Sequence, residues 1–269
     1  MTDRAVILAR GLGTRMRRAE PGAGLDAAQA AVADAGIKAL IPVGRPFLDY
    51  VISSLADAGL HRICLVVGPE HGDVQLRYGR DLALTRVSID FAIQQEPRGT
   101  ADAVLAAEPW TDGEPFVVLN SDNDYPVQAL RELAGLETPG VIAFGRQGLL
   151  ANGQIAPERI ATFAILDLED GMLRRVIEKP GAAMVTAASV DVRVSMNCWR
   201  FDRRVFEACR RVPLSPRGEL ELPMAVQQAL SDGLFEVHAV LSDEPVLDLS
   251  SRSDVAAVTR LVAGREVSL

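Results

Sequence analysis

The sequence predicts an α/β fold in which a mixed, mostly parallel sheet is flanked by helices. Two observations from the first half of the chain predict it. Four short runs are apolar nearly throughout, as in parallel strands covered on both faces, and segments with helical spacing separate them. The predicted strands are 5–9, 62–67, 87–93 and 115–119, and the predicted helices are 46–58, 73–80 and 100–108, with Thr100 as an N-cap. This alternation of strand and helix favours a doubly wound sheet.

The second half of the chain has a different rhythm. Runs at 141–145, 160–168, 173–179 and 190–201 are predicted strands with short links, and Asp170-Gly171 is a turn between two of them. Helical patterns follow at 203–211, 218–231 and 253–263, with one more strand at 235–240. We therefore expect one domain over 1–269, divided into a first half of about 1–140 and a smaller β-rich lobe of about 141–269. The sequence has no repeat of about 20–50 residues and no hexapeptide tail, so we expect no C-terminal β-helix domain.

Composition and charge argue against several classes of protein. The chain has 36 acidic and 28 basic residues and a net charge of −8, and its basic residues form no stripe, so nucleic acid is not an expected partner. Apolar runs such as 5–9 are far shorter than the roughly 20 residues that span a bilayer, and the start lacks the features of a signal peptide. We expect a cytoplasmic protein with no membrane association. The 3 cysteines have no metal-type spacing and are expected to be reduced thiols. The oligomeric state stays open, a homo-oligomer included.

A glycine-rich segment follows the first predicted strand. In LARGLGTRM, residues 8–16, Gly11 and Gly13 let the backbone turn tightly and bring its amides close to an anion. Thr14 and Arg15 add a hydroxyl and a guanidinium, so a triphosphate would fit there. The segment is not a Walker A loop, and Met16 stands where a Rossmann fingerprint has its third glycine. A plain tight turn is the alternative interpretation of this segment taken alone.

Several segments together resemble one enzyme family. LARGLGTRM resembles LAGGxGTRL, the signature of the sugar-1-phosphate nucleotidylyltransferases, and further matches follow in the order of that family. They are Lys38 in IKALIPV, Gln94, Gly99 and Thr100 in QQEPRGTADA, Asp122 in VVLNSDN, Glu178-Lys179-Pro180, SMNCWRF at 195–201, SPRGELEL at 215–222 and Asp248 in VLDLSS. The resemblance runs from residue 5 to about residue 260. It implies a Rossmann-like nucleotidyltransferase fold with a nucleotide-binding first half and a sugar-phosphate-binding second half.

The resemblance also implies a reaction and a role for each matched residue. An NTP and a sugar 1-phosphate, or a similar phosphorylated polyol, would give an NDP-sugar and pyrophosphate with the help of Mg²⁺. The implied catalytic residues are Arg15, Lys38 and Lys179; the nucleotide-binding residues are Leu8, Ala9, Gly11, Gly13, Thr14, Gln94, Gly99 and Thr100; the sugar-phosphate-binding residues are Ala161, Glu178, Lys179 and Asn197; the metal ligands are Asp122 and Asp248. Gln94 would read the nucleobase.

The chemistry of two polyanionic substrates supports this assignment independently. Bringing two phosphorylated molecules together requires a divalent cation and several basic side chains. Lys38 and Lys179 are the chain's only lysines, and both fall in matched motifs. Each residue taken alone also has a purely structural interpretation. An aspartate at a strand end often caps a turn, and Glu178-Lys179 would serve equally as a solvated ion pair.

Four departures from the family pattern leave the nucleobase and the sugar open. Arg10 stands where the family has glycine, and Asn197 replaces another glycine. In PERIATF, Ile160 and Ala161 stand where many relatives carry Tyr-Gly. The segment between Arg15 and Lys38 is about twice the expected length, and its excess, residues 19–36, combines a Gly/Pro-rich turn with an Ala-rich helix. We interpret this insert as a lid over the nucleotide.

Two other function classes remain as alternatives. A non-catalytic regulatory protein that binds a nucleotide or a sugar nucleotide would keep the same fold without turnover. A dinucleotide-dependent oxidoreductase is suggested by the glycine-rich segment alone, but no acidic residue ends a second strand about 20 residues further on, where the adenine ribose would need one. A pyrophosphate-release assay separates the first alternative from the enzyme.

Overall fold

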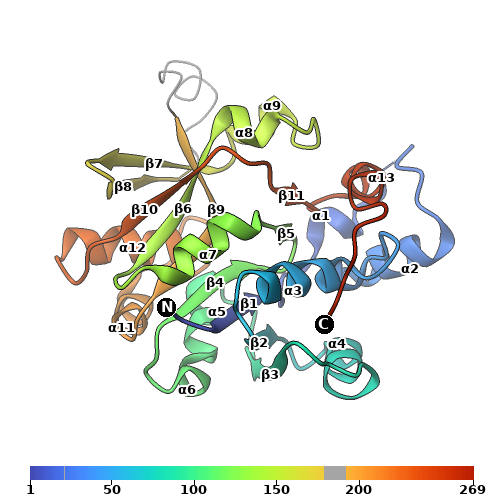
Figure 1. Ribbon diagram of the computed structural model, residues 1–269, viewed down its shortest axis with the longest axis horizontal. Helices are drawn as coiled ribbons and strands as arrows, with labels where there is room; N and C mark the ends of the chain where they lie inside the picture. Colours follow the sequence, from blue (N-terminus) through green and yellow to red (C-terminus); the bar gives the residue numbers. More distant parts are fainter. Residues whose placement is uncertain (21, 179–191) are drawn as a thin grey trace.

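The computed structural model describes residues 1–20, 22–178 and 192–269. Within them, a nine-stranded mixed sheet forms the centre of the molecule, in the order β3-β2-β1-β4-β9-β6-β10-β8-β7, and helices cover it (Figure 1). The strands are β1 Arg4–Leu8, β2 Arg62–Val67, β3 Ser88–Ile93, β4 Phe116–Asn120, β6 Gly140–Gly145, β7 Ala164–Glu169, β8 Met172–Ile177, β9 Arg193–Phe201 and β10 His238–Ser242. Two short strands, β5 Asn123–Asp124 and β11 Leu247–Asp248, pair separately.

The helical segments match most of the predicted ones. They are α1 Thr14–Arg17, α2 Ala27–Ala35, η1 Lys38–Leu40, α3 Phe47–Asp57, α4 Gly72–Leu76, η2 Arg77–Asp81, α5 Thr100–Ala106, α6 Glu108–Thr111, α7 Val127–Gly135, α8 Arg146–Leu150, α9 Pro157–Ile160, α11 Arg204–Arg211, α12 Leu222–Ser231 and α13 Arg252–Leu261. In the part of the chain that the structure describes, no helix is long and apolar enough to cross a membrane.

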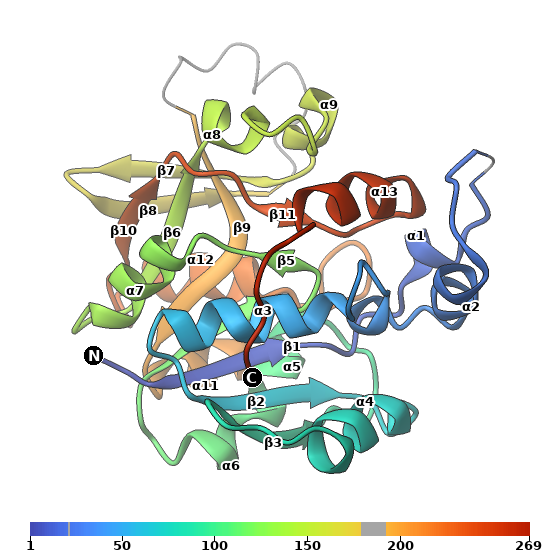
Figure 2. The same ribbon diagram turned by 45° about the vertical axis from the view of Figure 1, so that its right-hand side comes forward.

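The central strands β1, β2 and β4 are buried on both faces, as the apolar runs predict, whereas the edge strand β3 has exposed residues at Ser88 and Asp90. In β1, Ala5 and Ile7 join the core cluster that includes α3, α7 and α13, whereas Val6 joins the cluster of α5, α11 and α12 on the opposite face. Figure 2 shows α3 in front of the sheet and α11 behind it. Because successive strand residues point to opposite faces, a strand between two helical layers must be apolar at nearly every position. The three cysteines are free and buried.

The first half of the sheet is the predicted parallel, doubly wound part. β1 pairs in parallel with β2 on one side and with β4 on the other, and β3 continues beyond β2. The chain therefore moves outward from β1 to β3 and then returns to β4 on the other side of β1. Such a reversal of strand order leaves a crevice at the carboxyl ends of β1 and β4, where ligands bind in open α/β sheets.

The second half contains antiparallel strands, as its sequence pattern predicts, and they continue the same sheet. β9 runs antiparallel to β4, with Val118 opposite Trp199, and antiparallel to β6 on its other side. The later strands thus extend the same sheet, because β9 pairs with the edge of β4 that would otherwise be exposed. The turn between β7 and β8 is at Asp170 and Gly171, both with positive φ (51° and 76°), which confirms the predicted hairpin.

Three local predictions are wrong in detail. Thr100 is the first residue of α5, and the N-cap is Gly99. Residues 157–160 form helix α9, with a proline in its first turn, so the strand predicted from 160 begins at Ala164. β10 begins at His238 and not at residue 235.

Candidate active site

Two adjoining cavities open at the carboxyl ends of β1 and β4. The larger has a volume of about 570 Å³ and the smaller about 320 Å³. Thr100, Asn120, Asp122 and Glu219 line both, so the two spaces share a wall that includes Asp122. The arrangement offers two compartments, each large enough for a small molecule, with a shared wall of polar side chains.

The smaller cavity gathers most of the residues that the sequence assigns to the nucleotide. Its lining includes Leu8, Ala9, Gly11, Thr14, Lys38, Gln94, Gly99, Thr100 and Asp122. They come from the loop after β1, from η1, from the loop after β3, from the start of α5 and from the turn after β4. No protein atom lies within 4 Å of where a side chain on Gly11 would begin, so the backbone there is open to a ligand.

Gly13 has a structural role and does not line either cavity. Its φ is 59°, and a Cβ at this position would lie 2.3 Å from the carbonyl oxygen of Gly36. Glycine is therefore required where the loop after β1 packs against the end of α2. In the structure Gly13 contacts the end of the insert at Gly36, and its role in nucleotide binding stays a prediction.

Gly99 ties the two halves of the chain together beneath the cavities. Its φ is 116°, and a Cβ would lie 2.4 Å from the carbonyl oxygen of Leu220. The Leu220 N–H donates to Arg98 O (2.7 Å), and the Ala101 N–H donates to Leu220 O (2.8 Å). The Thr100 hydroxyl accepts from the Leu222 N–H at 2.8 Å. The predicted nucleotide segment is thereby fixed to the SPRGELEL segment.

Gln94 is buried beside the smaller cavity with its amide orientation fixed. Its Nε2 donates to Gly99 O at 3.0 Å and to Asp102 Oδ2 at 2.8 Å. Sequence reasoning missed Asp102, although it lies inside the matched segment QQEPRGTADA. The sequence did offer a signal for it: Asp102 is an acidic residue in the first turn of the helix that follows Gln94, the predicted base-reading residue.

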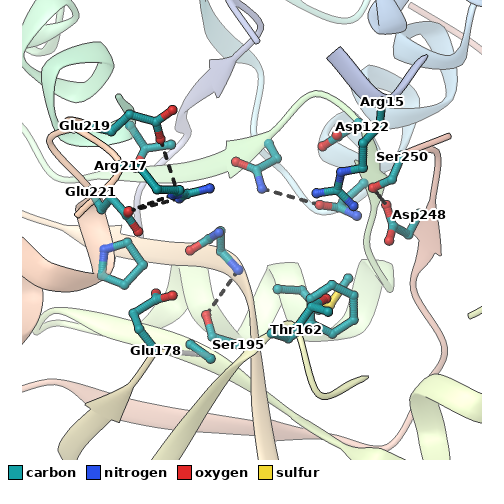
Figure 3. A pocket seen from close by; sticks show the side chains of 18 of the residues that line it. Arg15, Asp122, Thr162, Glu178, Ser195, Arg217, Glu219, Glu221, Asp248 and Ser250 are labelled. Carbon is teal, nitrogen blue, oxygen red and sulfur yellow. Dashed lines mark hydrogen bonds and ion pairs between the residues drawn. The ribbon is translucent and has the colours of Figure 1, made fainter. Parts of the chain in front are cut away.

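The larger cavity gathers the residues assigned to the sugar phosphate and to the metal. Arg15, Asp122, Ala161, Glu178, Asn197 and Asp248 line it. Figure 3 shows Arg15, Asp122, Ser250 and Asp248 at one end of this cavity and Arg217, Glu219 and Glu221 at the other. Arg15 is exposed to this space and not to the nucleotide-side cavity. Lys179 lies outside the described residues.

Asn197 explains one departure from the family pattern. Its φ is 57°, in the left-handed region where glycine is the usual residue and asparagine is the best tolerated alternative. The residue interrupts the regular pairing of β9 with β6. Asn197 therefore keeps the backbone geometry of a glycine and adds an amide to the cavity wall.

Asp122 and Asp248 are brought together by the ladder between β5 and β11. Asp248 pairs with Asn123, and the Leu249 N–H donates to Asp122 O at 2.8 Å. The Lys38 Nζ lies 2.8 Å from Asp122 Oδ2, so a predicted catalytic cation is held on a predicted metal ligand. These long-range contacts bring three of the predicted site residues to one point.

Asp248 is held in a buried polar cluster. The Ser250 hydroxyl donates to Asp248 Oδ1 at 2.6 Å, Arg159 pairs with Asp248 Oδ2, and Arg159 Nη1 also lies 2.7 Å from Asp254 Oδ1. Burial raises the pKa of Asp248 to about 6; the Arg159 guanidinium opposes this shift, and the charge of Asp122 adds to it. Arg159 is a site residue that sequence reasoning missed.

The two carboxylates suit a hard divalent cation. Among the described residues, no group of three or more histidine, cysteine, aspartate and glutamate side chains could hold a metal ion. Asp122 and Asp248, which line the same end of the larger cavity, are the pair that the sequence predicts as metal ligands. Mg²⁺ is commonly bound by one or two carboxylates, with phosphate oxygens and water as the other ligands, so the pair fits this cation.

Arg217 is a second cation that sequence reasoning left unassigned. Its Nη2 lies 2.9 Å from Glu221 Oε1, and the hydrogen bond that Arg217 donates to the Glu221 carboxylate raises the pKa of Arg217. Glu219 and Glu221 flank it at the end of the larger cavity away from Asp248 (Figure 3). The alternation of Arg217, Glu219 and Glu221 in SPRGELEL was the signal, because alternate residues of an extended segment face one side.

A family model described as nucleotidyl transferase matches residues 32–255. The chain belongs to the nucleotidyl transferase family. The Rossmann-like fold that the resemblance implied is confirmed. The chain is 28% identical over 233 residues to the low-salt glycan biosynthesis nucleotidyltransferase of Haloferax volcanii, a match that covers 86% of this chain and 58% of the relative. It is 27% identical over 264 residues to the glucose-1-phosphate thymidylyltransferase of Streptomyces antibioticus, covering 96% and 66%.

A third relative, the bifunctional protein GlmU of Aquifex aeolicus, is 26% identical over 269 residues, covering 96% of this chain and 53% of the relative. The chain thus spans between about half and two thirds of the length of these relatives. Among solved structures, UDP-glucose pyrophosphorylase complexed with UDP-glucose is similar in fold, with a TM-score of 0.74 at 17% identity over 99% of this chain and 100% of that one.

Proposed function

We propose that this nucleotidyl transferase joins an NTP to a sugar 1-phosphate, or to a similar phosphorylated polyol, and releases pyrophosphate. One observation carries the proposal: two cavities, one lined by the glycine-rich loop and one by the sugar-side strands, adjoin along a shared polar wall that includes Asp122. A reaction between two phosphorylated substrates needs two such compartments with their phosphates at the common wall.

The proposed chemistry is a direct displacement. A phosphate oxygen of the sugar phosphate attacks the α-phosphorus of the NTP, the new P–O bond forms, and the bond to pyrophosphate breaks with no covalent enzyme intermediate. The loop amides at Gly11 and the Lys38 ammonium stabilise the charge of the triphosphate in the smaller cavity. Arg15 supplies a further positive charge from the wall of the larger cavity. Catalysis is then mainly positioning and electrostatic stabilisation of the transferred phosphoryl group.

Mg²⁺ dependence is part of the proposal. When bound, the cation would neutralise the reacting phosphates and polarise the α-phosphoryl group, and Asp122 and Asp248 would hold it. In the structure, Lys38 pairs with Asp122 and Arg159 pairs with Asp248, so each of the two carboxylates has a basic partner.

The sugar phosphate is assigned to the larger cavity. Glu178 and Asn197 offer polar groups to sugar hydroxyls, and Ala161 leaves room beside them. Lys179 keeps its predicted role as the clamp on the sugar phosphate, and Arg217 is a second candidate for this charge. A cytoplasmic location and a homo-oligomeric state stay predictions.

A matrix of the common NTPs against a panel of sugar 1-phosphates and polyol phosphates, with released pyrophosphate as the readout, tests the proposal. We expect one combination to give Mg²⁺-dependent release of pyrophosphate with an equal amount of NDP-sugar. Nucleotide binding without pyrophosphate release from any combination would favour the regulatory protein that binds nucleotides without turnover.

A further inference from the structure

The hydrogen bonds of Gln94 leave one side-chain atom for a ligand. A glutamine amide has two N–H donors and one acceptor oxygen. Both N–H groups are used within the protein, by Gly99 O at 3.0 Å and by Asp102 Oδ2 at 2.8 Å, and the residue is only 4% exposed. Gln94 lines the smaller cavity, so Oε1 is the polar atom that it presents to a bound molecule.

The amide cannot reverse while Asp102 is in place. A carbonyl oxygen and a carboxylate both accept hydrogen bonds and donate none. Turning the amide over would set Oε1 of Gln94 against two oxygen atoms and leave the buried bonds unmade, which is unfavourable. Asp102 does not line either cavity among the described residues, so it acts through Gln94.

A second observation concerns donors on the same cavity wall. The side chain of Arg10 is only 6% exposed and lines the smaller cavity. Its Nη2 donates to Gln95 O at 3.1 Å and lies 3.3 Å from Glu70 Oε1, whereas the buried Nε and Nη1 have no hydrogen-bond partner among the described residues. A guanidinium carries only N–H donors, so its place in the cavity wall favours a ligand oxygen over a ligand amino group.

The acceptor on Gln94 and the donors on Arg10 match one class of nucleobase. Uracil, thymine and guanine carry a ring N–H next to a carbonyl oxygen. At the corresponding positions, cytosine and adenine carry a bare ring nitrogen next to an amino group, so their pattern of donors and acceptors is inverted. Arginine is also the side chain that most commonly recognises the oxygen-bearing edge of guanine.

We propose that Asp102 is a positioning residue that holds Gln94 as an acceptor, and that the site therefore selects UTP, dTTP or GTP over CTP and ATP. This inference rests on the proposed function, because it takes the smaller cavity to be the nucleotide site. It adds to that function the residue that fixes the choice of base and the chemical class of base chosen.

The test is equilibrium binding of UTP, dTTP, GTP, CTP and ATP by calorimetry, without sugar phosphate. For the unmodified chain, we expect the tightest of the first three to bind at least about tenfold more tightly than CTP or ATP. In Asp102→Ala this ratio should fall by about five- to tenfold. Without Asp102, the side-chain amide of Gln94 is free to reverse and to donate to the ring nitrogen of cytosine or adenine. Gln94→Ala should compress the ratio similarly.

Two further variants separate this role from a structural one. Asp102→Asn keeps an acceptor oxygen beside Gln94 and should retain more of the selectivity than the alanine variant does. Asp73→Ala is the matched control, because Asp73 is also an acidic residue in the first turn of a helix, α4, and lines neither cavity. Its ratio should not change.

The outcomes are distinct for the two proposals. If the unmodified chain binds none of the five nucleotides, the nucleotide site and this inference both fail. If it binds CTP or ATP as tightly as the others, only this inference fails. If Asp102→Ala weakens all five nucleotides equally, Asp102 merely stabilises α5, and its positioning role is wrong.

Discussion

Asp248 lies opposite Asn123 in the short ladder between β5 and β11, and this pairing sets its carboxylate beside Asp122. The two aspartates come from opposite halves of the chain: Asp122 lies in the turn between β4 and β5, and Asp248 lies on β11, and both line the larger cavity. Arg159 and Ser250 hold the Asp248 carboxylate in a buried position. The geometry of the proposed reaction centre therefore depends on a few long-range contacts.

The burial of Asp248 predicts a pH effect on the stability of the metal-free protein. Its folded pKa, about 6, is above the ordinary 3.8, so the neutral form is favoured in the folded state. Its stabilising contribution is present below about pH 4 and is lost as pH rises through 6, by up to about 3 kcal/mol. Unfolding free energies of the unmodified chain and of Asp248→Asn, measured from pH 4 to 7 with a chelator, should differ by this decline. Parallel curves for the two proteins would contradict the buried state of Asp248.

Gly99→Ala should destabilise the protein more than an alanine at another positive-φ glycine. At Gly99 the new Cβ would collide with Leu220 O, whereas at Gly113, with φ of 78°, no atom lies within 4 Å. Gly113→Ala should cost only the backbone strain of about 1–2 kcal/mol, and Gly99→Ala should cost more than this. Denaturant unfolding of both variants checks the comparison. Equal losses would show that the contact between Gly99 and Leu220 adds nothing.

The insert 19–36 is predicted to respond to the nucleotide through Gly13. Helix α2 begins with a capping box between Asp26 and Gln29 and contributes no residue to the lining of either cavity. Its end at Gly36 nevertheless contacts the loop after β1. If nucleotide binding orders that loop, local opening of α2 should become less frequent. Hydrogen exchange of the insert should slow when NTP and Mg²⁺ are added. Unchanged protection would make α2 a fixed structural element and would remove the lid interpretation.

The sequence predicts the strands of the central sheet and its doubly wound half, because apolar runs and turn residues are local signals. The resemblance to the family adds much of the lining of the smaller cavity and a smaller part of that of the larger one. The sequence does not predict Arg159 or Asp102, since their roles depend on partners that only the fold brings near. Arg159 reaches Asp248 across 89 positions, and Thr100 reaches Leu222 across 122. The continuation of one sheet through β9 is likewise decided by long-range strand pairing, which the alternation of residues in β9 does not specify.

In the proposed function the substrates meet near Asp122 and Asp248, which would hold a divalent cation. The most direct measurement is Mg²⁺-dependent pyrophosphate release by Asp122→Asn and Asp248→Asn beside the unmodified chain, with circular dichroism as a check on folding. Each substitution removes a charged oxygen ligand, so turnover should fall at least ~10²-fold while the fold stays intact. Folded variants that keep near-normal Mg²⁺-dependent rates would contradict the account.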